Sequence, residues 1–212
     1  MNHFNHKINM EFENIHVKDI YNNISSYFNN TRTYTWTWIN ETINDLPKNS
    51  TICDLGCGNG RNMNNKKYNF IGIDNSTELL KICQDKNLNV LQGDMCDIPL
   101  TDNSVDCVMC IAAFHHLSTP ERRKKSLQEM KRITKQNGRI IISVWSINQP
   151  KKTRREFHEY GDTIVKWNQY GKIYNRYYYI FKINEILNLF QETDLTLIKH
   201  IWDCGNEIFI LQ

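Results

Sequence analysis

Two segments near the start of the chain carry apolar residues at helical spacing. Val17 to Asn30 has apolar side chains three or four positions apart, and similar spacing runs from Trp36 to Leu46, where Pro47 interrupts it. Such spacing places apolar side chains on one face of a helix, and proline ends a helix. We therefore expect helices over 17–30 and 36–46, preceded by a polar, aperiodic and flexible tail over residues 1–15.

From residue 50 onward, short apolar runs alternate with helical segments. Five runs have the length and composition of buried strands, at 50–55, 69–75, 88–92, 104–112 and 138–145. Helical patterns occur at 76–87 and 119–136, where Ser76 and Thr119 are placed to cap the helix N-termini. Strands that alternate with helices form a parallel sheet that is covered on both faces.

The end of the chain has a different pattern. A helical segment over 182–193 precedes two apolar runs, 194–202 and 207–212, which are joined by a tight turn at 203–206. Two runs joined by so short a turn form an antiparallel hairpin. The sequence thus predicts an α/β fold with an open, mostly parallel, seven-stranded Rossmann-like sheet, a C-terminal antiparallel hairpin and helices on both faces. We expect a single domain over residues 16–212.

Glycine and acidic residues follow three of the predicted strands. The first strand runs into Asp54-Leu55-Gly56-Cys57-Gly58-Asn59-Gly60, the second ends at Asp74, and the third is followed by Gly93-Asp94-Met95. In an open parallel sheet these positions meet at the carboxyl edge, where ligands bind. A carboxylate beside the glycines would repel a pyrophosphate. It suits the ammonium and sulfonium charges of S-adenosylmethionine, with Asp74 accepting from the ribose hydroxyls and Asp94 from the adenine amino group.

Composition indicates the cellular compartment and argues against a metal site. The chain has 212 residues, seven irregularly spaced cysteines, no run of 18 apolar residues and no hydrophobic segment at its start. We therefore expect a protein of a reducing compartment, the cytoplasm or the nucleus, without a membrane segment. Cys107 and Cys110 form a Cys-x-x-Cys pattern inside an apolar run, and no second pair completes a four-cysteine site. We expect both to pack in the core and expect no metal site.

Charge is distributed unevenly along the chain. The segment from Ser118 to Arg176 contains fifteen basic and five acidic residues, a net charge of +10, whereas the remainder carries −7 and the whole chain +3. A basic block in an otherwise acidic protein indicates a surface that faces a polyanion. The alternative is that the block is the solvated face of one amphipathic helix.

Several of these motifs match known families. DLGCGNG, GIDNS and GDM together resemble the class I S-adenosylmethionine-dependent methyltransferases. A narrower resemblance runs from His16 to the end: Tyr27-Phe28-x-x-Thr31-Arg32-x-x-x-Trp36, CIAAFHHLSTPERR, SVWSINQ and NRYYYIFK are similar to the eukaryotic tRNA (carboxymethyluridine-5-O)-methyltransferases. That family esterifies the carboxymethyl group on the wobble uridine of the anticodon. The chain departs from its pattern at Thr33, at Lys166 and in a shorter segment over 149–175, and these departures concern the substrate more than the cofactor.

The resemblance and the residue chemistry together give a candidate site. A carboxylate nucleophile is already ionised at neutral pH, so we expect no strong base around the substrate, only cationic and neutral donors. The catalytic candidates are His115, Arg32, Trp145 and Arg176. Trp145 could stack on the uridine or merely cap the core, and Arg32 could instead neutralise the cofactor carboxylate. His116 is interpreted as a packing histidine. The candidates for binding S-adenosylmethionine are Asp54, Gly56, Cys57, Gly58, Asp74, Asn75, Asp94, Met95 and Ile111.

The resemblance also implies macromolecular partners. The expected polyanion is tRNA, gripped at the phosphates of its anticodon stem-loop by Arg122, Arg123, Lys151, Lys152, Arg154 and Arg155. A small zinc-binding methyltransferase activator protein is implied as well, pairing with the edge strand at 88–92. Two other functions remain open: a small-molecule methyltransferase and a non-catalytic tRNA-binding module. A nicotinamide oxidoreductase is disfavoured by Asp54.

Overall fold

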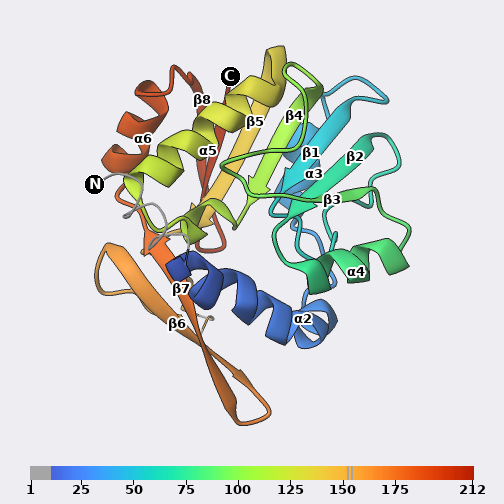
Figure 1. The fold of residues 1–212 in the computed structure, drawn as a ribbon. Coiled ribbons are helices and arrows are strands. Elements are labelled where there is room, and N and C mark those ends of the chain that lie inside the picture. Colours follow the sequence, from blue (N-terminus) through green and yellow to red (C-terminus); the bar gives the residue numbers. More distant parts are fainter. Residues whose placement is uncertain (1–10, 152, 154) are drawn as a thin grey trace.

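The computed structural model describes residues 11–151, 153 and 155–212. Within them, seven strands form one sheet in the order β3-β2-β1-β4-β5-β9-β8 (Figure 1). The parallel strands are β1 (Thr51–Leu55), β2 (Asn69–Asp74), β3 (Val90–Gln92), β4 (Val105–Ile111) and β5 (Thr134–Trp145). β9 (Asn206–Leu211) runs antiparallel to both β5 and β8 (Leu197–Asp203). The predicted Rossmann-like sheet with its C-terminal hairpin is confirmed.

Helices cover both faces of this sheet. The helical segments are η1 (Asn14–Lys18), α2 (Asp19–Thr31), α3 (Thr37–Ile43), α4 (Thr77–Asp85), η2 (Phe114–His116), α5 (Pro120–Ile133) and α6 (Ile183–Gln191). Ser76 and Thr119 cap α4 and α5 as expected, accepting from the backbone N–H of Leu79 and Arg122. α5 ends three residues before the predicted residue 136, because Thr134 already pairs with Val105 of β4.

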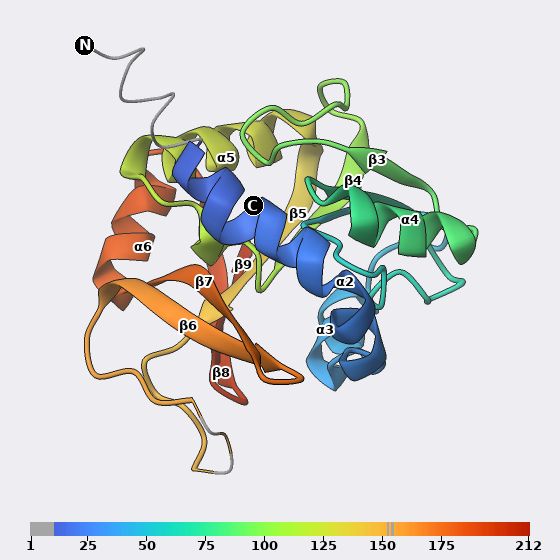
Figure 2. The same ribbon diagram turned by 60° about the horizontal axis from the view of Figure 1, so that its bottom comes forward.

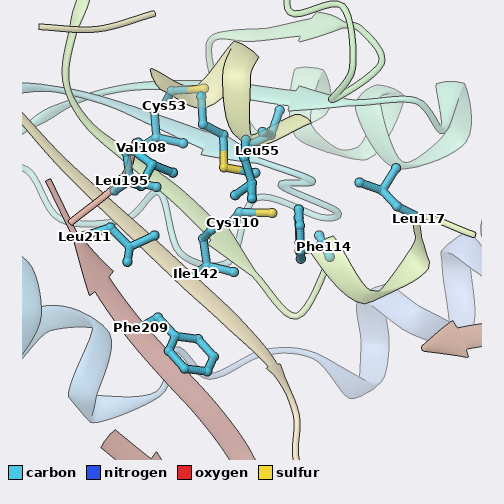
Figure 3. Close-up of a cluster of buried hydrophobic side chains, with 14 of the residues drawn as sticks. Cys53, Leu55, Val108, Cys110, Phe114, Leu117, Ile142, Leu195, Phe209 and Leu211 are labelled. Carbon is cyan, nitrogen blue, oxygen red and sulfur yellow. The ribbon is translucent and has the colours of Figure 1, made fainter. Parts of the chain in front are cut away.

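The buried core lies on both sides of the sheet. On one side, residues of α5, α6 and the sheet pack together around Phe114, Leu127 and Phe209. Figure 3 shows part of this cluster, with Phe114 and Phe209 labelled. On the other side, Trp38, Ile39 and Ile43 of α3 pack against the sheet. Cys107 and Cys110 of β4 belong to these two different clusters, and both are fully buried. Successive strand positions point to opposite faces, so residues three apart do too. The prediction that both cysteines pack in the core is confirmed.

The chain also forms a hairpin that sequence analysis missed. β6 (Gly161–Gln169) and β7 (Lys172–Ile180) pair in an antiparallel two-stranded sheet around the turn Tyr170-Gly171. The hairpin projects from the body of the sheet beside α2 (Figures 1 and 2). Half-buried and exposed residues alternate along β6, but Lys, Trp, Asn and Gln make that alternation hard to see in hydropathy.

The N-terminal helical segment begins earlier than expected. Residues 11–15, assigned by sequence to a tail, are helical, and the Glu13 carboxylate is buried. It accepts hydrogen bonds from the Ser118 N–H (2.7 Å) and hydroxyl (2.8 Å) and from Arg122 Nε (2.8 Å). These contacts fix the segment to the start of α5, so the expected boundary at residue 15 was too late. Residues 1–10 lie outside the described part of the chain. Among the described residues, no helix is both long and apolar enough to cross a membrane.

Candidate active site

A cavity of about 1050 Å³ lies at the carboxyl ends of β1, β2, β4 and β5. It sits where the strand order switches direction, the usual ligand position in an open α/β sheet. One part of its wall comes from the glycine loop after β1 and from the ends of β2 and β4. The opposite part comes from α2, β6 and β7, with residues of the loop that follows β5.

The glycine loop needs its glycines for backbone shape and for packing. Gly56, Gly58 and Gly60 all have positive φ, between 57° and 74°. A Cβ on Gly56 would lie 2.4 Å from the Cβ of Ala113 in the loop after β4. The loop can therefore turn tightly against β4 only with glycine at this position. The backbone N–H groups of the loop are used within the fold: those of Gly56 and Cys57 donate to the carbonyl of Ile73, and that of Gly58 donates to Asp74.

Asp54 is a buried carboxylate without a partner. It is fully buried at the end of β1, and neither carboxylate oxygen has a hydrogen-bond donor among the described residues. Burial raises the pKa of Asp54 to about 7, and the nearby Arg61 guanidinium only partly offsets this. The carboxylate does not line the cavity directly, but its neighbours Leu55 and Gly56 do. An unpaired buried carboxylate in this position fits a cationic ligand group.

The other two predicted acids line the cavity and are partly satisfied. Asp74 accepts hydrogen bonds from the N–H groups of Gly58 (2.8 Å) and Ser76 (2.9 Å), and burial raises its pKa. A carboxylate has about four acceptor positions, so two remain for ligand hydroxyls. Asp94 accepts from Cys96 N–H (2.7 Å) and from Nη2 of Arg122 at 2.8 Å and 3.0 Å. The predicted cofactor residues Gly56, Cys57, Gly58, Asp74, Asn75, Asp94, Met95 and Ile111 all line the cavity.

Three arginines converge on the opposite part of the cavity. Arg32 follows α2, Arg155 follows β5, and Arg176 lies in β7, and all three line the cavity. Burial, and then the charge of the other arginines, lowers the pKa of Arg32 and Arg155. They stay protonated near neutral pH, because a free guanidinium titrates far above it. This part of the cavity therefore has a positive potential that suits an anionic group.

Aromatic rings hold these arginines in place. The guanidinium of Arg176 lies 4.6 Å from the ring centroid of Trp167, and that of Arg155 lies 4.3 Å from Trp145. Trp145 stacks on Tyr178 with centroids 4.0 Å apart and planes inclined by 8°. The predicted residues Arg32, Trp145 and Arg176 are thus brought together by the structure.

The structure places the two adjacent histidines differently from expectation, with His116 and not His115 at the cavity. His115 is fully buried beneath the cavity and does not line it, so it is not positioned to touch a substrate there. Its Nδ1 accepts from the backbone N–H of Trp145 (3.1 Å). His116, interpreted as a packing residue, lines the cavity instead. The short 3₁₀ turn η2 explains the reversal, because it turns the first histidine inward and the second towards α2.

A directed chain of hydrogen bonds starts at His116. Its Nδ1 lies 2.7 Å from the carbonyl oxygen of Tyr177, which can only accept, so Nδ1 carries the proton. Its Nε2 therefore accepts from the hydroxyl of Tyr21 (3.1 Å), which in turn accepts from Tyr178 (3.2 Å). Tyr178 accepts from Nη1 of Arg176 (2.6 Å). Burial lowers the pKa of His116 to about 3, so the ring is neutral and the chain keeps one direction.

The structure corrects the expected tRNA-binding role of two arginines. Arg122 is buried and pairs with Glu13 and Asp94, each at 2.8 Å. Arg123 is also buried: it donates to the carbonyls of Leu117 (3.0 Å) and Ser118 (3.2 Å) and lies 3.4 Å from the ring centroid of Tyr179. Neither side chain is available to an RNA phosphate, because both already hold the start of α5 in place.

The other four residues predicted to contact RNA do not form one surface in the described chain. Lys151 is exposed, Arg155 lines the cavity instead of flanking it, and Lys152 and Arg154 lie outside the described residues. Most other cations of the basic block are paired within the chain. These pairs are Lys124–Glu192, Lys125–Glu129, Lys131–Asp194, Arg132–Asp102, Arg132–Glu129, Lys135–Asp106 and Arg139–Asp45. The α5 part of the block therefore pairs with Glu129 of the same helix and with acids of other segments, and is no open polyanion surface.

Comparison with known proteins now identifies the family. Residues 53–142 match a family model described as a methyltransferase domain. The chain is 30% identical over 220 residues to the tRNA (carboxymethyluridine(34)-5-O)-methyltransferase of Schizosaccharomyces pombe, covering 93% of this chain and 96% of that protein. It is 39% identical over 140 residues to the enzyme of the same name from Arabidopsis thaliana, covering 66% of this chain and 35% of that protein.

The chain belongs to the class I S-adenosylmethionine-dependent methyltransferases, in the family of the tRNA (carboxymethyluridine(34)-5-O)-methyltransferases. It spans about a quarter to a third of the length of other curated family members that it matches. The fold is also that of solved methyltransferases. An S-adenosylmethionine-dependent methyltransferase of Clostridium acetobutylicum superposes with a TM-score of 0.68 at 12% identity, covering 91% of this chain and 98% of the other.

A second structural neighbour is a complex of the Haloferax volcanii Trm112 methyltransferase activator with a methyltransferase. The TM-score is 0.67 at 17% identity, and the match covers 92% of this chain and 96% of the other. Identity this low shows a shared fold alone. The family's cofactor is S-adenosylmethionine, and its cationic groups fit the cavity wall at Leu55 and Gly56, next to the unpaired, buried Asp54.

Sequence reasoning missed several cavity residues of this methyltransferase. Tyr21, Trp167 and Tyr178 line the cavity, although none of the three was among the candidate site residues. Arg61 lines it as well and lies 4.2 Å from the ring centroid of Trp36. The only available signal for Tyr178 was the aromatic motif NRYYYIFK, in which alternate residues of a strand face one side.

Proposed function

We propose that this protein methylates the carboxymethyl group of the wobble uridine in tRNA, using S-adenosylmethionine. The supporting observation is the charge division of a single cavity. Acidic groups suited to a cationic cofactor lie at one side, and Arg32, Arg155 and Arg176 lie at the other. Trp167 beside Arg176 offers an aromatic ring for a nucleobase, whereas Trp145, the expected stacking residue, is buried against Tyr178 and beneath Arg155.

The two buried histidines of the site support a substrate whose nucleophile is a carboxylate. His115 is fully buried, and burial lowers its pKa well below the ordinary value. His116 uses both ring nitrogens in hydrogen bonds, and its pKa is about 3. Neither histidine is therefore suited to remove a proton from a hydroxyl or amine. A carboxylate needs no such base, because its pKa is near 4 and it is ionised at neutral pH.

The protein's contribution would then be positioning and exclusion of water. S-adenosylmethionine supplies the methyl group, bound by its cationic amino-acid portion near Asp54 and by its ribose and adenine near Asp74 and Asp94. The arginines would hold the substrate carboxylate in line with the methyl carbon. Orientation of this kind contributes up to about 7–11 kcal/mol to lowering a barrier. Charge-assisted arginine–carboxylate pairs supply the required geometry.

The decisive experiment is mass spectrometry of tRNA nucleosides after incubation with the protein and S-adenosylmethionine. The tRNA is taken from cells that lack the corresponding endogenous enzyme. We expect the methyl ester to appear at wobble carboxymethyluridine, and we expect the free nucleoside to react poorly. Methylation of another nucleoside, or efficient methylation of a free small carboxylate without tRNA, would contradict the proposal.

We also propose that a small zinc-binding activator protein pairs with β3. This strand is one edge of the sheet, bonded only to β2, and Leu91 is 39% exposed there. The backbone groups of an open edge can accept another strand, and an exposed apolar residue adds contact area. The structural neighbour from Haloferax volcanii is itself a complex of the Trm112 methyltransferase activator with a methyltransferase.

The test compares the two edges of the sheet. Leu91→Lys in β3 should reduce co-purification with the activator at least tenfold. Ile198→Lys is the matched control, because Ile198 is 59% exposed on β8 at the opposite edge. Loss of the complex only in the β8 variant would place the activator at the other edge. A chain that is fully active and monomeric without activator would contradict the proposal.

A further inference from the structure

The tip of the β6–β7 hairpin carries an unusual residue. The turn contains two residues, Tyr170 and Gly171, with φ of 51° and 86°. Two successive positive φ values define the type I′ hairpin turn, in which Asn-Gly is the favoured pair. A bulky aromatic residue is disfavoured in this left-handed conformation. The tyrosine is therefore not explained by the needs of the turn.

Tyr170 also contributes nothing to the core. It is 89% exposed, the highest value among the large hydrophobic residues of the described chain. Its ring is nevertheless held: it meets Tyr27 of α2 edge-on, with centroids 5.3 Å apart and planes at 80°. Tyr27 in turn contacts Trp167 edge-on at 5.9 Å. An edge-on contact covers at most one face of a ring, so the single contact of Tyr170 holds this exposed ring while leaving at least one of its faces open.

This aromatic row starts inside the cavity and ends at the exposed tip. Trp167 lines the cavity beside Arg32 and Arg176. Tyr27 and then Tyr170 continue outward from it. We call Tyr27 and Tyr170 the outer stacking pair. A polymer whose reacting unit lies in the cavity would pass over this pair with its next units.

The surrounding charge is uniformly positive. Residues 20–40, which include most of α2, and residues 163–184, which include most of the hairpin, contain no Asp or Glu. The same two segments carry Arg32, Lys166, Lys172, Arg176 and Lys182. Within the described chain, Lys166 and Lys172 have no acidic group within ion-pair distance, unlike the lysines of α5. Aromatic faces flanked by unpaired lysines are how proteins bind unpaired RNA bases.

We propose that the outer stacking pair binds the unpaired nucleotides next to the modified uridine in the anticodon loop. The inference rests on the proposed function and extends it to a recognition surface outside the cavity. Lys172 lies two positions from the tip and would contact the loop phosphates. The hairpin would therefore select a single-stranded RNA loop over a free nucleoside.

The test uses Tyr170→Asn, which creates the Asn-Gly turn. This variant should fold at least as well as the parent chain, so a loss of binding cannot come from unfolding. The probe is a 17-nucleotide anticodon stem-loop with 2-aminopurine beside the wobble position. We expect its affinity to fall at least about fivefold, the smallest effect of losing one base–aromatic stack. The fluorescence change on binding should be lost in parallel.

Two controls separate stacking from other effects. Tyr170→Phe should keep affinity and fluorescence within twofold, since the ring face remains. Tyr160→Asn removes a tyrosine that is 45% exposed at the base of the hairpin and should leave RNA binding unchanged. Urea unfolding of all variants checks the fold.

The outcomes for the two proposals can be told apart. If the parent chain methylates tRNA and Tyr170→Asn binds the stem-loop normally, the stacking inference is overturned while the proposed function stands. If the parent chain binds the stem-loop but methylates no tRNA, and Tyr170→Asn abolishes that binding, the surface is an RNA site and the proposed reaction is wrong. If the parent chain does not bind the stem-loop at all, the stacking inference is overturned.

Discussion

At the scale of single residues, burial decides what each polar group of the site can do. Asp54 is fully buried without a donor, and its pKa of about 7 reflects the cost of keeping that charge away from water. A cationic ligand would restore the missing partner. Ionised Asp54 therefore destabilises the ligand-free protein but strengthens ligand binding, a combination that is common at binding sites.

The first prediction concerns the pH dependence of Asp54. Unfolded aspartate has a pKa near 4, so between about pH 4 and 7 the folded chain binds more protons than the unfolded chain. The stability of the ligand-free protein should therefore fall as pH rises through this interval. Asp54→Asn should be more stable than the parent chain at pH 8, with little difference at pH 4. Urea unfolding at both values measures this.

Cofactor affinity should change in the opposite direction. Binding of S-adenosylmethionine should strengthen as pH rises through about 7, because ionised Asp54 attracts its cationic groups. Asp54→Asn should bind at least tenfold more weakly at pH 8 and lose this pH dependence. Calorimetric titration of both proteins measures it, and a pH-independent affinity in the parent chain would contradict the assignment.

The second prediction concerns the hydrogen-bond chain behind Arg176. Tyr178→Phe removes the acceptor of Arg176 Nη1 but keeps the ring that stacks on Trp145. A hydrogen bond to a charged group is worth about 1.5–3 kcal/mol, so KM for tRNA should rise at least about tenfold. Affinity for S-adenosylmethionine should not change, because the tyrosine lies with the arginines. An equal loss for both ligands would indicate general misfolding instead.

At the scale of elements, short loops and one hairpin build the site on a common sheet. The glycine loop packs against the loop after β4, and η2 directs His116 towards α2. β6 and β7 supply the wall that carries Trp167 and Arg176. The sheet fixes where these segments start, and local contacts fix which side chains reach the cavity.

The third prediction separates the two roles of glycine in the loop. Gly56→Ala and Gly161→Ala both place a side chain at positive φ, with φ of 74° and 97°, which costs about 1–2 kcal/mol. Only the Gly56 variant adds a clash, since its Cβ meets Ala113 at 2.4 Å whereas nothing lies within 4 Å at Gly161. We expect Gly56→Ala to be clearly less stable in urea and to lose S-adenosylmethionine binding. Equal stability of the two variants would contradict the packing argument.

At the scale of the whole molecule, ion pairing and not composition decides which basic residues are free to bind a polyanion. The basic helix α5 faces acids of other segments, and Lys124 and Lys131 pair with Glu192 and Asp194. The acid-free segments 20–40 and 163–184, which carry Arg32, Lys166, Lys172, Arg176 and Lys182, keep their positive charge for solvent or ligand. A polyanion is therefore expected at the hairpin side of the cavity (Figure 2).

The fourth prediction tests this division with two double variants. Lys166→Glu with Lys172→Glu should weaken tRNA binding and reduce the salt dependence of affinity by about 0.7–0.9 per lysine in a log–log plot. Lys124→Glu with Lys131→Glu has the same change in net charge and should keep tRNA affinity nearly unchanged. Fluorescence anisotropy from 50 to 200 mM salt measures both. Equal effects would show that net charge alone governs binding.

The sequence by itself determined the sheet and the cofactor side of the cavity. Strands there are apolar runs bounded by glycines and acids, and the carboxyl ends of parallel strands must meet, so Asp54, Asp74 and Asp94 could be placed from spacing. The basic count over 118–176 was correct, but it could not say which charges are free. Arg122 and Arg123 are buried because Glu13 and Tyr177, distant in sequence, reach them.

Only the tertiary structure decided the substrate side. The β6–β7 hairpin escaped detection because its inner face is aromatic and cationic, so hydropathy shows little alternation. One 3₁₀ turn exchanged the roles of His115 and His116, a difference that spacing cannot resolve. Local hydropathy patterns reflect which residues are buried in the chain's own core. The wall of a binding cavity depends instead on which side chains, distant in sequence, come into contact there. That is why the acid positions followed from strand spacing, whereas Arg32, Trp145 and Arg176 were candidates from the resemblance and residue chemistry, and only the structure joined them into one wall.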